Sequence, residues 1–199
     1  MLRDQALAAS GLLVQRIGGT PVKGYQPTGV WEEATFGRKQ YQQDIGEALY
    51  RRSLYTFWRR IIAPTMFFDN ASRQTCTVKT FRTNTPLQAL LTLNDVTFVE
   101  SARALSERVL MSDVSDDAGR VDAIFRRVLS RHPSEPEKQI LVAAVERSRS
   151  EFQADVEAAE KLLAVGESKR SEQLDAVEHA AWTSLVLAVM NLDEALTKE

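Results

Sequence analysis

The sequence is poor in the residues that most often carry metal and covalent chemistry. Its 199 residues include one cysteine, Cys76, and two histidines, His132 and His179. A single cysteine excludes an internal disulfide and a Cys-x-x-Cys-His haem attachment motif. Two histidines far apart in the sequence indicate no metal site, and no cofactor is expected. No histidine lies near Cys76 in the sequence, so we interpret it as a buried structural thiol.

Common catalytic and membrane signatures are missing as well. There is no Gly-x-x-x-x-Gly-Lys phosphate loop, no Gly-x-Gly-x-x-Gly, no His-Glu-x-x-His and no Gly-x-Ser-x-Gly. No run of 18 apolar residues predicts a membrane-spanning helix. The formal net charge of −2 gives no global attraction to nucleic acid. We therefore predict no catalytic residue, and whether the chain is an enzyme stays open.

The composition and the hydrophobic pattern indicate one domain over residues 1–199. Its N-terminal region, residues 1–82, is largely irregular, and the region after it is helical. Hydrophobic residues make up 44% of the chain and charged residues 26%, as is usual for a globular protein. Residues 1–82 hold an N-terminal helix and an aperiodic loop over 20–46, which is rich in glycine, proline and aromatic residues. We interpret this loop as an arm packed over the core, because its rings Tyr25, Trp31, Phe36 and Tyr41 need burial.

Apolar residues spaced by three and four predict amphipathic helices through most of the chain. The first covers 2–17 and ends at Gly18-Gly19. The others cover 86–93, 95–110, 117–129, 134–165 and 175–190. The stretch 49–62 is ambiguous between helix and strand, and 75–81 alternates like a short strand. The predicted fold class is mainly α: a bundle of four to five helices with an irregular aromatic-rich N-terminal segment and a short β element.

The most specific local signal lies at the start of the helical region, over residues 83–199. Thr85, Pro86 and Gln88 form a capping box with proline at the first helical position. A helix N-terminus with arginines beside it can hold an anion or a carboxylate. The candidate ligand-binding set is Asp69, Arg73, Arg82, Asn84, Thr85, Gln88 and Asn94. An internal polar network among these side chains is the alternative, which we favour.

Several segments resemble the domain of unknown function 1553 family, the C-terminal module of large planctomycete-type proteins. They include Arg-Ser-Leu-Tyr-Thr-Phe-Trp-Arg at 52–59, Cys-Thr-Val at 76–78, Arg-Thr-Asn-Thr-Pro-Leu-Gln-Ala-Leu at 82–90 and Leu-Asn-Asp at 93–95. Further matches lie at 4–14, 22–27, 129–137, 165–168, 181–183 and 191–199. The chain departs from the family at Asn70-Ala71, where Ala-Pro usually follows Asp69, and at Lys169, where proline is common.

The resemblance implies a domain context and a cellular location, but no particular reaction. Such proteins often carry a cytochrome c-like domain upstream, look exported to the periplasm or cell envelope, and have no settled activity. The family domain normally begins well before the segment matching Met1, which implies that this chain is the C-terminal part of a longer module.

Two functions follow as hypotheses. The first is a non-catalytic structural or interaction module of a larger exported envelope protein. Its partners would be upstream domains of the same protein, and an apolar patch in its N-terminal third would favour self-association. The second is part of an enzyme or ligand-binding site, for an anionic or carbohydrate ligand, centred on the Thr85 helix N-terminus. Sugar stacking on Tyr25, Trp31 and Tyr41 is a weaker possibility.

Overall fold

A computed structural model describes residues 2–57 and 85–197, and the structural statements below refer to these residues. In chain order the helices are α1 (Leu2–Ser10), α2 (Val30–Ala34), the 3-10 helices η1 (Gly46–Tyr50) and η2 (Ser53–Tyr55), α3 (Pro86–Asn94), α4 (Val96–Leu110), α5 (Asp117–Leu129), α6 (Glu135–Ala154), α7 (Val156–Leu163), α8 (Ala176–Met190) and α9 (Asp193–Leu196). The prediction of a mainly helical fold is confirmed, but the described stretches hold more helices than the expected four to five.

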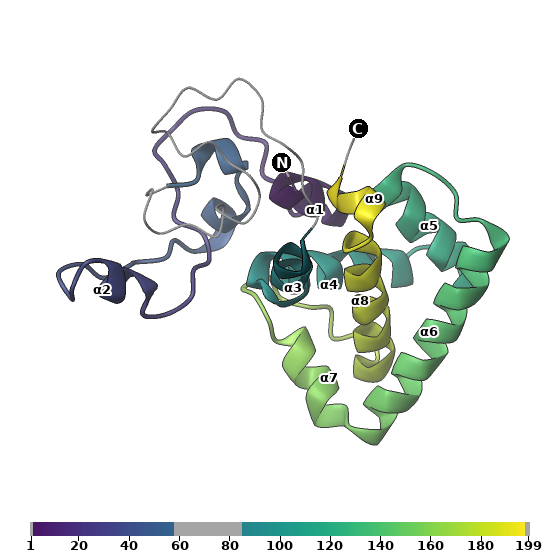
Figure 1. Cartoon of the computed structure of the whole chain (residues 1–199). Coiled ribbons are helices and arrows are strands. Elements are labelled where there is room, and N and C mark those ends of the chain that lie inside the picture. Colours follow the sequence, from purple (N-terminus) through teal and green to yellow (C-terminus); the bar gives the residue numbers. More distant parts are fainter. Residues whose placement is uncertain (1, 58–84, 198–199) are drawn as a thin grey trace.

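Helix α8 lies at the centre of the helical body, and α3, α4, α5, α6, α7 and α9 pack around it (Figure 1). Asp175 caps its first turn by accepting the Glu178 N–H at 2.9 Å. Apolar residues occur around most of its circumference, so burial on every side is favourable. The face predicted to be buried is buried: Trp182, Leu185, Val186 and Val189.

The predicted apolar stripes of α4 and α5 form the main core together with α8. Asp95 caps α4 and Asp116 caps α5, each by accepting a backbone N–H of the first turn. The stripe predicted for α5 included Leu129, which is only partly buried. The other residues of the two predicted stripes are buried in one cluster: Phe98, Ala102, Leu105, Val109, Val121, Ile124, Phe125 and Val128.

The prediction of a helix over 2–17 is wrong at its C-terminal end. Helix α1 ends at Ser10, and Gly11 follows with φ of +83°, a conformation that glycine adopts without strain. The next apolar residues pack in a second, smaller core around Leu7, Leu49 and Tyr50. The apolar pattern therefore continues past Ser10 because Leu12, Leu13 and Val14 pack, partly buried, against this core, although the backbone is not helical there.

The prediction of one long helix over 134–165 is wrong as well. The chain turns at Asp155, whose carboxylate accepts the Ala158 N–H at 3.0 Å and so caps a new helix. The turn brings α7 back against the central helix, where Ala159 and Leu163 contact Ala180. Figure 1 shows α6 and α7 as two sides of a V with α8 between them.

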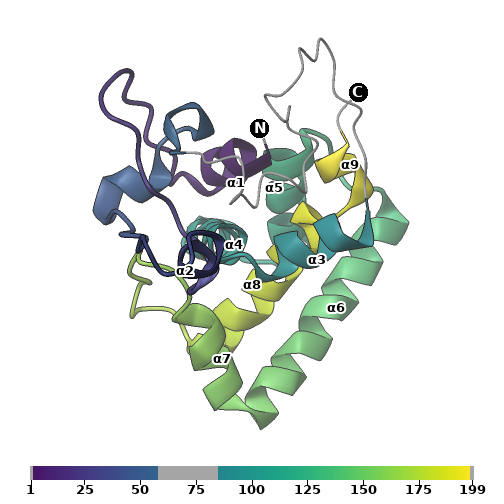
Figure 2. The ribbon, with the colours of Figure 1, turned by 60° about the vertical axis from the view of Figure 1, so that its left-hand side comes forward.

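Residues 11–57 form an irregular segment, here called the N-terminal arm, beside α1 and α4 (Figure 2). Trp31 is buried within the arm, with its ring 5.3 Å from Tyr41 and 5.9 Å from Phe57. Tyr25 and Tyr41 are half-buried, and Phe36 is 94% exposed, so the expectation that the four rings are buried is wrong for Phe36 and holds fully only for Trp31. Phe36 has φ of +52° at the end of α2, which directs the chain away from the cluster.

The ambiguous stretch 49–62 is neither a regular helix nor a strand up to residue 57. It contains η2 and two isolated parallel bridges, Val14 to Arg51 and Val22 to Thr56. Residues 58–62 and the predicted strand over 75–81 lie outside the described residues.

Candidate functional site

The predicted capping box at the start of α3 is present. Thr85 Oγ1 accepts the Gln88 N–H at 3.3 Å, and Gln88 Oε1 accepts the Thr85 N–H at 2.7 Å. Of the predicted site residues, Asp69, Arg73, Arg82 and Asn84 lie outside the described residues. Asn94 ends α3, about 13 Å along the helix axis from Thr85, and its amide donates to Leu90 O at 2.8 Å. The structure therefore brings Thr85 and Gln88 together and separates Asn94 from them.

Helix α3 packs with its polar side inward. Gln88 and Thr92 are 3% and 2% exposed, and the Thr92 hydroxyl lies 2.7 Å from Asn191 Oδ1 at the end of α8. Leu87, Leu90 and Leu93 are 60%, 59% and 41% exposed on the other side. These three leucines, called the α3 leucine face below, are spaced by three residues and lie along one side of the helix.

A buried polar cluster that the sequence analysis missed lies where the N-terminal arm meets α4. The Glu100 side chain is fully buried, and its carboxylate accepts hydrogen bonds from Tyr25 Oη at 3.0 Å and Tyr50 Oη at 2.8 Å. It also accepts the Ser168 N–H at 2.6 Å. The Arg103 guanidinium lies 3.8 Å from the carboxylate and donates to Ser168 Oγ at 2.6 Å. This set is called the Glu100 cluster.

The Glu100 cluster keeps its two phenols protonated. Burial, reinforced by the Glu100 charge, raises the pKa of Tyr25 far above its usual value. Burial and the hydrogen bond to Glu100 raise the pKa of Tyr50 to about 12. Both tyrosines are therefore neutral donors at physiological pH, and they satisfy a carboxylate that would be costly to bury alone.

A glycine allows the loop between α7 and α8, residues 164–175, to reach Glu100. Gly166 has φ of +91°, and a Cβ at this position would overlap the Glu100 carboxyl group. The next residue joins the loop to the arm, because the Glu167 N–H donates to Tyr25 Oη at 2.9 Å and its carboxylate accepts the Gly46 N–H at 2.7 Å. No local sequence signal could have revealed this site, because Tyr25, Glu100 and Ser168 lie far apart in the chain.

His179, on α8, contacts the backbone of Arg103, a residue of the Glu100 cluster. Its Nε2 is 3.1 Å from Arg103 O, so Nε2–H is the donor and Nδ1 carries the lone pair. Nδ1 is buried without a hydrogen-bond partner. Burial lowers the pKa of His179 below its usual value, so the ring is neutral at physiological pH. The other histidine, His132, is exposed and pairs with Asp122 at 2.6 Å, rather than with the helix-terminal carbonyls that its position suggests.

A second network of charged side chains joins α5, α6 and α8. Arg149 donates two hydrogen bonds to Asp117, at 2.6 and 3.0 Å, and two to Glu178, at 2.6 and 2.7 Å. Glu178 also accepts Trp182 Nε1–H at 2.8 Å. The hydrogen bonds from Arg149 lower the pKa of both carboxyl groups. Two carboxylates held ionised by one guanidinium stabilise the fold, and they do not form an acid and base pair.

Arg51 organises the first turn of the N-terminal arm. Its side chain is buried, donates to the carbonyl oxygens of Arg16, Gly18 and Thr20, and lies 4.1 Å from the centre of the Tyr55 ring. The guanidinium thus replaces backbone hydrogen bonds that this irregular loop does not make.

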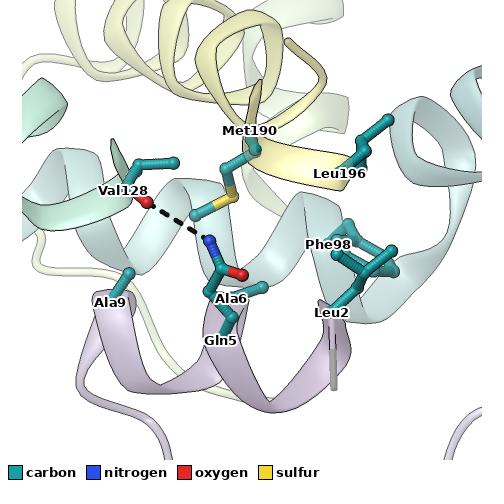
Figure 3. Close-up of a pocket in the computed structure, with 9 residues that line it drawn as sticks. Leu2, Gln5, Ala6, Ala9, Phe98, Val128, Met190 and Leu196 are labelled. Atoms are coloured by element: carbon teal, nitrogen blue, oxygen red, sulfur yellow. Dashed lines mark hydrogen bonds between the residues drawn. The ribbon is translucent and has the colours of Figure 1, made fainter. Parts of the chain in front are cut away.

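The cavity shown in Figure 3 is too small for a substrate. It measures about 20 Å³, enough for roughly one water molecule, and Gln5 is its one polar side chain, donating to Val128 O at 3.2 Å. The lining residues are Leu2, Gln5, Ala6, Ala9, Phe98, Val128, Met190, Ala195 and Leu196.

The described residues hold neither a cluster of metal-binding side chains nor a membrane-spanning helix. Residues 2–57 and 85–197 contain no group of three His, Cys, Asp or Glu side chains placed to hold a metal ion. No helix among these residues has the length and the hydrophobicity that crossing a bilayer requires.

Comparison with known proteins identifies the family. Residues 1–145 match the family model described as PSD1, Protein of unknown function (DUF1553), and the chain therefore belongs to this family. The matched region includes Tyr25, Tyr50, Glu100 and Arg103, whereas Gly166–Ser168 and His179 follow it. No curated protein and no solved structure matches the chain.

Proposed function

We propose that this chain is a non-catalytic structural and interaction module of a larger exported envelope protein. The observation that carries the proposal is the orientation of α3, which directs three leucines outward and buries Gln88 and Thr92. A helix that buries its polar side against its own body keeps the apolar side for another surface. Pro86–Asn94 also contains no charged residue in a chain that is 26% charged, as is typical of the centre of an interface.

The polar clusters support a structural role for the rest of the molecule. The Glu100 carboxylate accepts hydrogen bonds from Tyr25, Tyr50 and Ser168. Arg149 forms ion pairs with both Asp117 and Glu178. These carboxylates are thus bonded to side chains and backbone groups of the protein itself, fully buried at Glu100 and partly exposed at Asp117 and Glu178. Trp31, the strongest ring for sugar stacking, is 6% exposed within the arm, which disfavours a carbohydrate site there.

The partner that we propose for the α3 leucine face is another part of the same longer protein. Three partly exposed leucines offer a few hundred Å² of apolar surface, roughly a third of what a stable free complex buries on each partner. A tethered partner needs less area, because the linker gives it a high effective concentration. The expected location, the periplasm or cell envelope, rests on the family resemblance alone.

Co-expression tests this proposal. The chain and the segment encoded upstream in the same gene are produced as separate polypeptides and co-purified. We expect a complex that is lost with Leu90→Asp and retained with Ile140→Asp, a control at an equally exposed residue of α6. A gene with no upstream segment, no complex, or equal loss with both substitutions would contradict the proposal.

An anionic ligand at the start of α3 is a second candidate, because Thr85, Pro86 and Leu87 are exposed there. Asp69, Arg73, Arg82 and Asn84 would complete this site with Thr85 and Gln88. Calorimetric titration with inorganic phosphate, and separately with neutral monosaccharides, tests it. Binding that Arg82→Gln abolishes and Arg38→Gln preserves would support the site.

A further inference from the structure

The 164–175 loop connects the N-terminal arm to α4. Toward the arm, the Glu167 backbone and side chain bond Tyr25 Oη and the Gly46 N–H. Toward α4, the Ser168 N–H donates to Glu100, and the Ser171 N–H donates to Glu107 at 2.9 Å. Moving the part of this loop after Val165, which itself packs against the main core, would therefore break polar contacts on both sides.

His179 lies on the α8 side of the same loop. Its neutral ring donates through Nε2–H to Arg103 O, and Nδ1 has no partner. The charged groups that act on the ring are Arg103 and Glu107 from α4 and Arg170 from the loop. From α7, the uncharged Ala159 and Leu163 face α8. On α8 itself, the neighbouring Glu178 is paired with Arg149 of α6.

We propose that His179 is an acid-operated latch, whose protonation releases the 164–175 loop from α4 and thereby loosens the N-terminal arm. The proton comes from solvent and binds at Nδ1, while Nε2–H continues to donate to Arg103 O. The imidazolium then carries an unpaired donor in a buried site, where the positive charges of Arg103 and Arg170 oppose it and the carboxylate of Glu107 favours it.

On protonation of His179, the 164–175 loop detaches while α4 and α8 stay packed against each other. Arg170 is only partly buried and can move into water, whereas α4 and α8 are joined through Leu105, Trp182 and Val186 in the main core. The Glu107 carboxylate, whose charge favours the protonated ring, can also move toward Nδ1–H and would then lose the Ser171 N–H. Both responses detach the loop. Burial, which lowers the pKa of His179, places this transition on the acid side of neutrality.

Amide hydrogen exchange at pH 7.5 and pH 5.0, corrected for the intrinsic effect of pH, tests the latch. We expect exchange at Glu167, Ser168 and Ser171 to accelerate at least tenfold at the lower pH, and exchange in the arm around Tyr25 to rise with it. The amides of Leu105 and Val186 should stay protected. His179→Gln, whose amide can still donate to Arg103 O but does not titrate, should remove the acceleration. His132→Gln, at the other histidine, should retain it.

A direct titration keeps the test independent of how the variants fold. The imidazole nitrogen signals of His179 in the unmodified protein should titrate with the same midpoint as the exchange at Ser168 and Ser171. Equal acceleration in His179→Gln, no acceleration in the unmodified protein, different midpoints, or simultaneous loss of protection at Leu105 and Val186 would each overturn the proposal.

Discussion

At the scale of single residues, this protein depends on polar side chains whose partners lie far away in the sequence. Glu100 receives hydrogen bonds from residues 75 and 68 positions away, Tyr25 and Ser168. Arg51 is buried among carbonyl oxygens of the arm rather than beside a carboxylate. Such groups are costly to bury without partners, so each one fixes the segments that satisfy it.

Thr85→Ala should lower the free energy of unfolding by about 1 kcal/mol, because the first turn of α3 loses the acceptor for the Gln88 N–H. Urea unfolding followed by circular dichroism measures this. Ser150→Ala, on the exposed side of α6, is the control and should have little effect. Identical curves for Thr85→Ala and the parent would show that the cap contributes nothing.

Gly166→Ala should lower the free energy of unfolding by more than about 1 kcal/mol, because alanine is strained at a φ of +91° and its Cβ overlaps the Glu100 carboxyl group. Gly24→Ala is the matched control, since a Cβ at Gly24 meets no atom within 4 Å and its φ is not positive. Denaturant titrations measure the free energy of unfolding of both variants. Equal values for Gly166→Ala and Gly24→Ala would argue against a close approach of the loop to Glu100.

At the scale of helices, the charged network of Arg149 determines how α5 and α8 meet α6. The Arg149, Asp117 and Glu178 side chains are 28%, 24% and 30% exposed, so water screens their interaction in part. Their contribution is accordingly smaller than that of a fully buried ion pair, but it acts on three helices at once.

Arg149→Met should cost about 1–2 kcal/mol at pH 7 after allowance for this screening. Asp117 and Glu178 have lowered pKa values in the folded state. The stability they contribute is therefore complete above their usual values of 3.8 and 4.5 and is lost as the pH falls through the folded pKa values. The free energy of unfolding should fall less between pH 6 and pH 3 in Arg149→Met than in the parent.

Arg147→Met, an exposed position of the same helix, is the control for the acid experiment and should retain the parent's pH dependence. Parallel acid profiles for the parent and Arg149→Met would show that other carboxyl groups govern the acid stability.

At the scale of the whole molecule, two cores share α1. Ala6 contacts the main core of α4, α5 and α8, whereas the neighbouring Leu7 belongs to the small core with Leu49 and Tyr50. The arm therefore has apolar contacts of its own and joins the helical body mainly through α1 and the Glu100 cluster. Exposed apolar side chains of the arm, such as Ile17 and Leu54, occur singly along the chain, and self-association stays a prediction.

Leu49→Ala should destabilise the arm more than the helical body. Removing a fully buried leucine costs about 2–5 kcal/mol, and the cavity falls within the small core. Native-state hydrogen exchange should accelerate across residues 11–57 with little change in α8. Leu105→Ala, in the main core, should instead accelerate exchange in both parts. If Leu49→Ala also lowered the protection of α8 to the same extent, the two cores would unfold as one unit.

The sequence by itself determined the features that depend on neighbours within a turn or two of helix. The Thr85 cap and the buried faces of α4, α5 and α8 could be predicted, because a cap needs an acceptor two or three residues before its donor and a stripe needs only spacing. The caps Asp95, Asp116 and Asp175 could be narrowed to two neighbouring residues each. The family could be recognised too, through segments such as 82–90.

Only the tertiary structure decided which surfaces these helices cover. The end of α1 at Ser10 and the turn at Asp155 follow from where the apolar side chains find partners, and spacing alone does not reveal this. The meeting of Tyr25, Glu100 and Ser168 is likewise a contact between distant segments. Helix α3 shows the physical reason: burial is favourable for Gln88 and Thr92 only because partners such as Asn191 lie opposite, and that depends on packing in three dimensions.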